Sequence, residues 1–146
     1  MTDMRNVTRK VGAGIGAAAL VASMAVAASQ ATAGADPAAH QVTYTVTSAG
    51  PYDFQVLYLT AQPPNKAAYN ADAYAFVKRE TINIGPDTPF VFSTTLDDPQ
   101  WAILQVSSTA KGGQAPPNAH CEISVDGQIA VVQDHPYSPM CQLGQW

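Results

Sequence analysis

The strongest constraint on the fold of this chain is a strict alternation of side chains over residues 41–47. Three apolar side chains fall on one side of an extended chain and three threonines on the other: Val42, Tyr44 and Val46 against Thr43, Thr45 and Thr47. This period of two in β-branched and aromatic residues is typical of a strand with one buried face. Residues 53–60 alternate again, and Leu57 and Leu59 add apolar side chains to the second face. That second segment is therefore predicted to be a central strand.

Further strands are predicted along the chain, separated by turns rich in Gly, Pro and Asp. They are expected over residues 76–84, 90–95, 101–107, 121–125 and 129–132, with a last short strand within 140–146. This pattern predicts an all-β fold, an immunoglobulin-like antiparallel β-sandwich of about seven short strands, and a β-barrel of the same strand count stays open. The long connection 61–75 interrupts the pattern, and its part 67–75 is expected to form a helical turn or two.

The clearest hairpin lies near the end of the chain. Asp126 and Gly127 separate two alternating apolar segments, and an Asp-Gly pair suits the type I′ turn, in which both residues need a positive φ. We expect the segment 140–146 to be attached to this hairpin through a disulfide bond.

The amino-terminal part of the sequence resembles a targeting signal. Three basic residues precede an uncharged, Ala-rich run over 11–28, and small residues follow it up to Ala35. This order predicts a secretory signal peptide over residues 1–35, cut after Ala33 or, preferably, after Ala35. A single β-sandwich domain over 36–146 would remain. The alternative, in which 11–28 is an uncleaved membrane anchor, stays open.

The charge balance excludes some classes of partner. Residues 36–146 carry four basic and ten acidic side chains, a formal charge of −6. Nucleic-acid binding needs a basic face, and docking on anionic phospholipid by charge alone needs one too. Because the whole chain is 47% hydrophobic and only 12% charged, a disordered protein is also excluded.

The two cysteines, Cys121 and Cys141, both lie in the predicted exported domain. Outside the cytosol such a pair is expected to form a disulfide. Closing a loop of about 20 residues would stabilise the fold by roughly 3 kcal/mol in the chain-entropy model. A metal site formed by two free thiolates is disfavoured, since zinc needs two further ligands at close spacing.

Three segments resemble the extracytoplasmic domain of the mycobacterial small membrane proteins, the MmpS family: Val42-Thr43-Tyr44-Thr45-Val46, Cys121-Glu122-Ile123-Ser124-Val125-Asp126-Gly127-Gln128-Ile129 and Cys141-Gln142-Leu143. The similarity spans about residues 41–143. It implies a small β-sandwich whose hairpin is bridged to a late cysteine, and an accessory role beside exporters of lipids and siderophores. The chain departs from this family in its cleavable amino terminus and in the insertion 61–75, so it is expected to be a secreted relative.

No catalytic motif stands out. The chain lacks the nucleophile elbow, the zinc-protease helix motif and the phosphate-binding glycine loop. Asp97 and Asp98 are read as a solvated turn. His120, His135 and Met140 flank the cysteines, but a copper site would need a free thiolate followed closely by His and Met. No enzyme activity, metal or cofactor is predicted.

The remaining candidate is a binding surface. Aromatic and proline residues gather in and around the long connection: Tyr52, Pro63, Pro64, Tyr69, Tyr74 and Phe76. Tyrosines are favoured at interfaces, and long loops on β-sandwiches often carry recognition. The alternative is that these side chains fold back over an open end of the sandwich.

We therefore expect a secreted or envelope protein without catalytic activity that acts as a binding module. Its partner would be an envelope protein or an apolar envelope ligand. A secreted carrier of a lipid or other small apolar ligand is the alternative, and an unrecognised hydrolase or metal protein is the third class.

Overall fold

The computed structural model describes residues 38–146, which form two four-stranded antiparallel sheets packed face to face. The strands are β1 (His40–Ser48), β2 (Tyr52–Leu59), β3 (Val77–Ile84), β4 (Phe90–Leu96), β5 (Ile103–Ser107), β6 (Ala119–Val125), β7 (Gln128–His135) and β8 (Met140–Gln142). The helix α2 (Lys66–Ala71) and the 3-10 helices η1 (Ala73–Ala75) and η2 (Pro99–Trp101) complete the fold. The signal peptide predicted over 1–35 lies outside the described residues.

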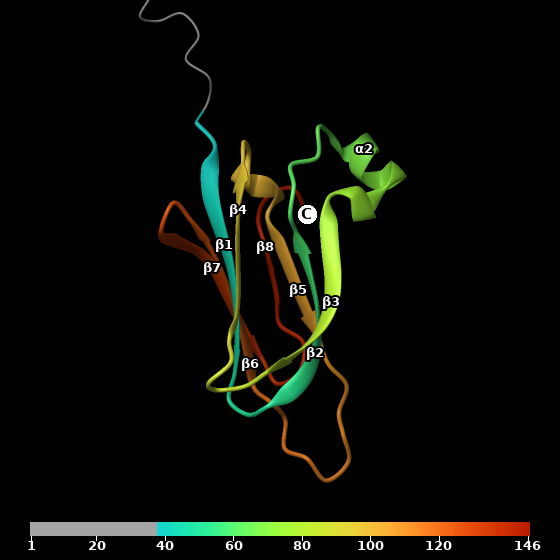
Figure 1. The fold of residues 1–146 in the computed structure, drawn as a ribbon, viewed down its shortest axis with the longest axis vertical. Coiled ribbons are helices and arrows are strands. Elements are labelled where there is room, and N and C mark those ends of the chain that lie inside the picture. Colours follow the sequence, from blue (N-terminus) through green and yellow to red (C-terminus); the bar gives the residue numbers. More distant parts are fainter. Residues whose placement is uncertain (1–37) are drawn as a thin grey trace, which may run out of the picture. The chain divides into compact units, whose positions relative to one another are not determined.

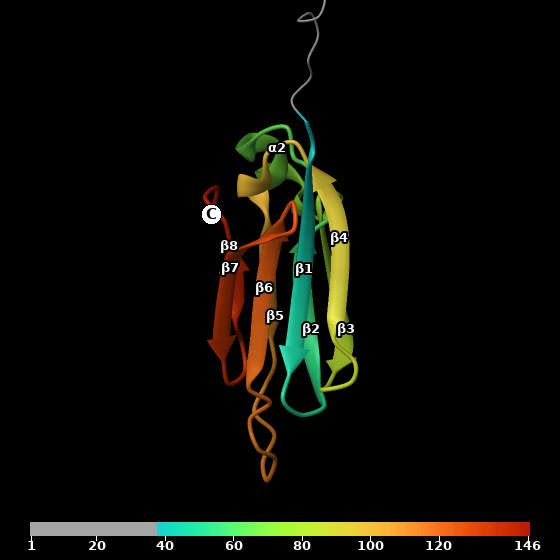
Figure 2. The ribbon, with the colours of Figure 1, turned by 90° about the vertical axis from the view of Figure 1, so that its left-hand side faces the viewer.

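The two sheets have the strand orders β4-β1-β6-β7 and β3-β2-β5-β8. Figure 1 shows them edge-on as two layers, and Figure 2 shows the first sheet from its outer side. The predicted β-sandwich is confirmed, with eight strands, and the barrel is ruled out because the strands form two separate sheets. The prediction that the second strand is central is also confirmed, since β2 lies between β3 and β5.

The first five strands are paired as in an immunoglobulin domain. If β1 to β5 correspond to strands B, C, C′, E and F, the observed pairs β1–β4, β2–β3 and β2–β5 match B–E, C–C′ and C–F. The chain then departs from that order, because β6 returns to pair with β1 on the side where strand A lies in immunoglobulins. The immunoglobulin likeness therefore covers β1 to β5 and β8, which pairs with β5 as strand G pairs with F, and it ends at the hairpin of β6 and β7.

The core lies between the sheets and follows the alternation in the sequence. Each sheet contributes every second side chain of its central strands, and these side chains are fully or almost fully buried: Val42, Tyr44, Val46, Phe54, Val56, Tyr58, Leu104, Val106, Cys121 and Ile123. The intervening side chains of β2 and β5, such as Gln55 and Gln105, are exposed on the outer face. Because alternate side chains of these strands are buried, the intervening ones form the outer face of the sheet, where the candidate site lies.

The hairpin between β6 and β7 has the predicted turn. Asp126 has a φ of 50° and Gly127 a φ of 82°, so both turn residues have the positive φ that type I′ requires. The Asp126 carboxylate accepts hydrogen bonds from the backbone N–H of Gln41, at 2.9 Å, and is 2.7 Å from His40 Nδ1. The turn is thus fastened to the start of β1.

One local prediction is wrong. Residues 101–107 were expected to form a continuous strand, but Trp101 belongs to the helix η2 and β5 begins at Ile103. Pro99 starts this helical turn and the Asp98 carboxylate caps it by accepting a hydrogen bond from the Gln100 N–H at 3.0 Å. Trp101 is nevertheless buried, as its apolar character predicts.

Among residues 38–146, no helix has the length and apolar character needed to cross a bilayer.

Candidate functional site

The residues of the predicted binding surface do not lie on one surface. Tyr52 is only 2% exposed and begins β2, whereas the connection 61–76 follows the end of that strand. The eight residues of β2 span about 25 Å at the usual rise per residue. The Tyr52 hydroxyl donates a hydrogen bond to the Thr109 carbonyl at 2.7 Å and accepts one from the Lys111 N–H at 3.0 Å. Tyr52 is therefore a core residue that holds the loop at the opposite end of the sandwich.

Tyr69 of the long connection packs at the end of the sandwich where α2 lies, and Figure 1 shows α2 at that end. Tyr69 packs edge-on against Trp146, with ring centroids 4.8 Å apart, and lies 6.3 Å from Trp101. The Lys66 ammonium lies over Trp146, at 4.3 Å from its centroid, and donates a hydrogen bond to the Gln145 carbonyl. This packing matches the alternative considered from the sequence, in which side chains of the long connection fold back over an open end of the sandwich.

The other residues of that predicted surface divide between core and solvent. Pro63 is buried and Phe76 half-buried, whereas Pro64 is exposed. Tyr74 is 64% exposed, and its ring centroid lies 5.9 Å from the guanidinium carbon of Arg79. A binding role for these residues remains a prediction. Through its contact with Arg79 on β3, Tyr74 connects the loop with the outer face of the β3-β2-β5-β8 sheet.

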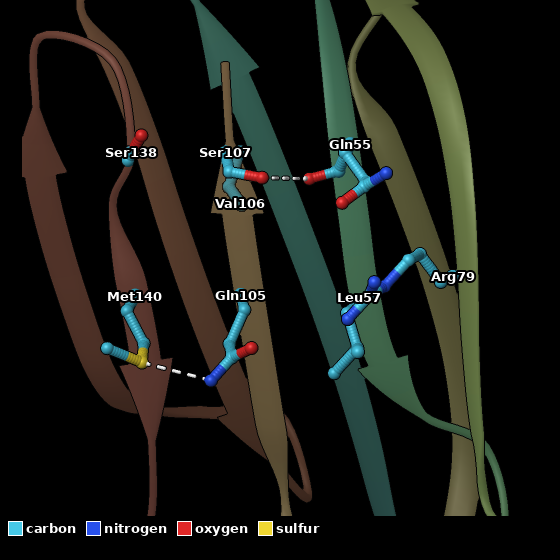
Figure 3. A pocket seen from close by; sticks show the side chains of 8 residues that line it. All are labelled: Gln55, Leu57, Arg79, Gln105, Val106, Ser107, Ser138 and Met140. Carbon is cyan, nitrogen blue, oxygen red and sulfur yellow. Dashed lines mark hydrogen bonds between the residues drawn. The ribbon is translucent and has the colours of Figure 1, made fainter. Parts of the chain in front are cut away.

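A groove of about 270 Å³ lies on the outer face of the β3-β2-β5-β8 sheet. Its floor is a row of side chains, one from each strand, that the register places side by side: Arg79, Leu57, Gln105 and Met140. A second row adds Gln55, Ser107 and Ser138. Figure 3 shows Arg79 extending from β3 toward Leu57 on β2, with Met140 at the far side. The groove thus places two apolar side chains, Leu57 and Met140, among polar ones, with a single cationic group at one end.

The electrostatics of this face set Arg79 apart. Asp53, farther along β2, is paired with Lys111 at 3.1 Å and accepts a hydrogen bond from Asn83 at 2.8 Å. The Asn83 hydrogen bond, followed by Lys111, lowers the pKa of the Asp53 carboxyl. Glu80 is paired with Lys78 at 3.1 Å. Within residues 38–146, no carboxylate lies within salt-bridge distance of Arg79.

Met140 is 48% exposed, and its sulfur accepts a hydrogen bond from Gln105 Nε2 at 3.3 Å. Leu57 carries a signal in the sequence, because it is an apolar side chain on the second face of a central strand, whereas Arg79 and Gln105 carry none and Met140 was considered only as a copper ligand. These residues come from four strands, and only the register brings them together.

The predicted disulfide is confirmed. Cys121 on β6 is bonded to Cys141 on β8, so the bond joins the two sheets, and no free cysteine remains among the described residues. The nearby histidines have other partners: His120 is 2.8 Å from Asp134, and His135 Nδ1 accepts hydrogen bonds from the Tyr137 and Ser138 N–H groups. Over residues 38–146, no group of three or more His, Cys, Asp or Glu side chains is placed to hold a metal ion.

The sequence is similar to those of known proteins. Residues 44–141 match the family described as the Rv2576c beta-sandwich domain. "Uncharacterized protein Rv2576c" of Mycobacterium tuberculosis is 42% identical to this chain over 118 residues, which are 80% of this chain and 74% of that relative. "Uncharacterized protein Mb2606c" of Mycobacterium bovis gives the same values.

No solved structure is similar enough to this chain to count as a match. The family description and the relatives' names do not mention MmpS, so the expected resemblance to MmpS is supported only as a shared mycobacterial β-sandwich. With the family match covering two thirds of the chain and relatives at 42% identity, this chain belongs to the Rv2576c beta-sandwich domain family.

Proposed function

We propose that this protein is an exported binding module of the cell envelope without catalytic activity. In this role it resembles the extracytoplasmic domains of the MmpS family, which accompany exporters of lipids and siderophores. The proposed contact surface is the outer face of the β3-β2-β5-β8 sheet.

The observation that carries the proposal is the groove on that face. Isolated apolar side chains on a surface are ordinary, but here Leu57 and Met140 lie in one hollow with a cation that has no carboxylate partner in the described part of the chain. Concave sites with an apolar lining and a few polar groups are typical of binding sites.

The disulfide supports export, and the packing of the core bears on where a ligand would bind. The disulfide joins the two sheets, and such bonds persist in oxidising compartments outside the cytosol. The cysteines are thereby occupied, and the buried space between the sheets is filled by packed apolar side chains. A carried apolar ligand, the alternative considered from the sequence, would therefore use the outer face.

A photo-crosslinking experiment in the protein's own host tests this proposal. A photoreactive residue at Gln105, in the centre of the groove, is compared with one at Thr95, which is exposed on the other sheet. The expected result is a defined adduct from position 105 alone, on protein recovered outside the cytosol with both cysteines oxidised. Protein retained in the cytosol with free thiols, or equal labelling from both positions, would contradict the proposal.

Mass spectrometry of the recovered protein adds a second readout. The denatured mass gives the amino terminus and the state of the two cysteines. A native mass that exceeds it by a constant amount would show that a ligand travels with the protein, and equal masses would direct the search to a protein partner.

A further inference from the structure

We propose that the groove on the outer face of the β3-β2-β5-β8 sheet binds a single-chain anionic amphiphile, with the anionic group on Arg79 and the chain over Leu57 and Met140. This inference rests on the proposed function and adds the chemical class of the ligand. The term anionic amphiphile is used here for a carboxylate or phosphate group joined to one unbranched apolar chain.

The first step of the argument is the charge of Arg79. The domain is acidic overall, yet its cations are mostly committed: Lys78 to Glu80, Lys111 to Asp53, and Lys66 to Trp146 and the Gln145 carbonyl. Within residues 38–146 the guanidinium of Arg79 has no carboxylate within salt-bridge distance, and its carbon lies 5.9 Å from the ring centroid of Tyr74. A guanidinium binds carboxylate and phosphate groups through paired hydrogen bonds, so an anion is its natural ligand.

The second step is the direction of the groove. Arg79, Leu57, Gln105 and Met140 follow one another across four neighbouring strands, each directly opposite the next in the register. Neighbouring strands lie about 4.8 Å apart, so this row runs about 14 Å across the sheet from the cation to the methionine. A molecule with charge at one end and an apolar chain behind it matches this order of side chains.

The third step is the size and polarity of the site. A volume of about 270 Å³ lies just below the usual range for ligand pockets, which favours one chain over a two-chain lipid. Met140 presents a flexible thioether that adapts to apolar groups of varied shape. The amide group of Gln55 borders the site and offers an N–H donor to the anion, whereas Gln105 Nε2 donates to the Met140 sulfur beneath the chain.

The matched cation for a control is on the same strand. Lys78 is exposed like Arg79, but it pairs with Glu80 and does not line the groove. Lys78→Gln therefore removes one positive charge beside the site without altering its lining. Arg79→Lys keeps the charge but loses the planar fork of donors.

The experiment is a titration of the protein recovered from its own host, grown with methionine labelled at the methyl carbon. The Met140 methyl resonance, assigned with the Met140→Leu variant, reports binding in the groove. The probes are dodecanoate and dodecyl phosphate below their micelle concentrations, dodecyl maltoside as a neutral chain, and inorganic phosphate as an anion without a chain.

We expect both anionic dodecyl probes to shift the Met140 methyl signal, and dodecyl maltoside and inorganic phosphate to bind at least tenfold more weakly. Arg79→Gln should weaken the anionic probes about tenfold, as loss of a charge-assisted contact predicts, with Arg79→Lys between it and the unchanged protein. Lys78→Gln should change these affinities less than twofold.

Several results would overturn the inference. Equal binding of dodecyl maltoside would reduce the site to an apolar patch, and equal binding of inorganic phosphate would reduce it to an anion site. Equal effects of Arg79→Gln and Lys78→Gln would show attraction by overall charge only. If no probe binds while the photoreactive residue at position 105 still labels a protein partner outside the cytosol, the ligand class is wrong and the proposed binding function stands.

Discussion

At the scale of single residues, two tyrosines of the core show how differently a buried hydroxyl can be accommodated. Tyr44 is fully buried, and its hydroxyl has no hydrogen-bond partner among the described residues. Burial raises the pKa of this hydroxyl well above its usual range, and the backbone of Ile103, which lies nearby without forming a hydrogen bond of normal geometry, offsets this only in part. Tyr58 is equally buried, but its hydroxyl donates a 2.6 Å hydrogen bond to the Glu80 carboxylate. The unpaired Tyr44 hydroxyl therefore lowers the free energy of unfolding, whereas the hydrogen-bonded Tyr58 hydroxyl raises it.

This difference predicts opposite effects of the same substitution. Tyr44→Phe should leave the free energy of unfolding unchanged or raise it by up to about 1 kcal/mol, because it removes an unpaired buried polar group. Tyr58→Phe should lower it by about 1 kcal/mol or more, since it breaks a hydrogen bond to a charged acceptor. Urea unfolding of both variants measures this. A larger loss for Tyr44→Phe than for Tyr58→Phe would refute the prediction.

At the scale of elements, the β6–β7 hairpin depends on its turn. Gly127 has a φ of 82°, a conformation that residues with a Cβ atom rarely adopt, although a Cβ there would meet no atom within 4 Å. The cost of a side chain at this position is therefore one of backbone conformation and not of space.

Gly127→Ala should lower the free energy of unfolding by about 1–2 kcal/mol, the cost of a left-handed conformation for an L-residue. Gly112→Ala is the matched control, because Gly112 also has open space around it but no positive φ. The control should be neutral or slightly stabilising. Thermal unfolding of the two variants measures this difference. Equal unfolding midpoints would argue against the type I′ turn.

Element prediction succeeded where the signal is local. The strands follow from the alternation of apolar and polar side chains, and the turn from two adjacent residues. It failed at Trp101, where the apolar pattern continued but the Pro99 start and Asp98 cap produced a helical turn. The predicted binding surface also combined Tyr52 with the connection 61–76. Tyr52 begins β2 and the connection follows the end of β2, so the length of this strand separates them.

At the scale of the whole molecule, the pH dependence of stability follows from three carboxyl groups. The pKa of Asp53 is lowered by Asn83 and then Lys111, that of Glu80 by Tyr58 and then Lys78, and that of Asp126 by His40 and then the Gln41 N–H. Each group is thus more readily ionised in the folded chain than in the unfolded chain.

Such groups stabilise the fold fully above their unfolded pKa values, and this contribution is lost as the pH falls through the folded values. We expect the urea midpoint to decrease as the pH is lowered below about 4, where unfolded carboxyls take up protons. Glu80→Gln should make this decrease shallower. A midpoint that stays constant or rises between pH 5 and pH 3 would show that these contacts do not persist in solution.

The disulfide between Cys121 and Cys141 is the covalent link between the sheets, with a sequence separation of 20. Reduction should lower the free energy of unfolding by about 3 kcal/mol, as expected for a loop of this length. The paired variant Cys121→Ala/Cys141→Ala should show the same loss and become insensitive to reductant. An unchanged thermal midpoint on reduction of the parent protein would contradict this role.

The sequence by itself determined where most strands lie, which side of the central strands is buried, the turn at Asp126-Gly127 and the pairing of the two cysteines. These features depend on neighbours two to four residues away or on there being a single pair of cysteines. The groove was decided only by the tertiary structure. Arg79, Leu57, Gln105 and Met140 are far apart in sequence, and they become neighbours because β8 pairs with β5, and β5 and β3 flank β2. Strand order is fixed by packing of the whole core, and so is the chemistry that its outer face presents.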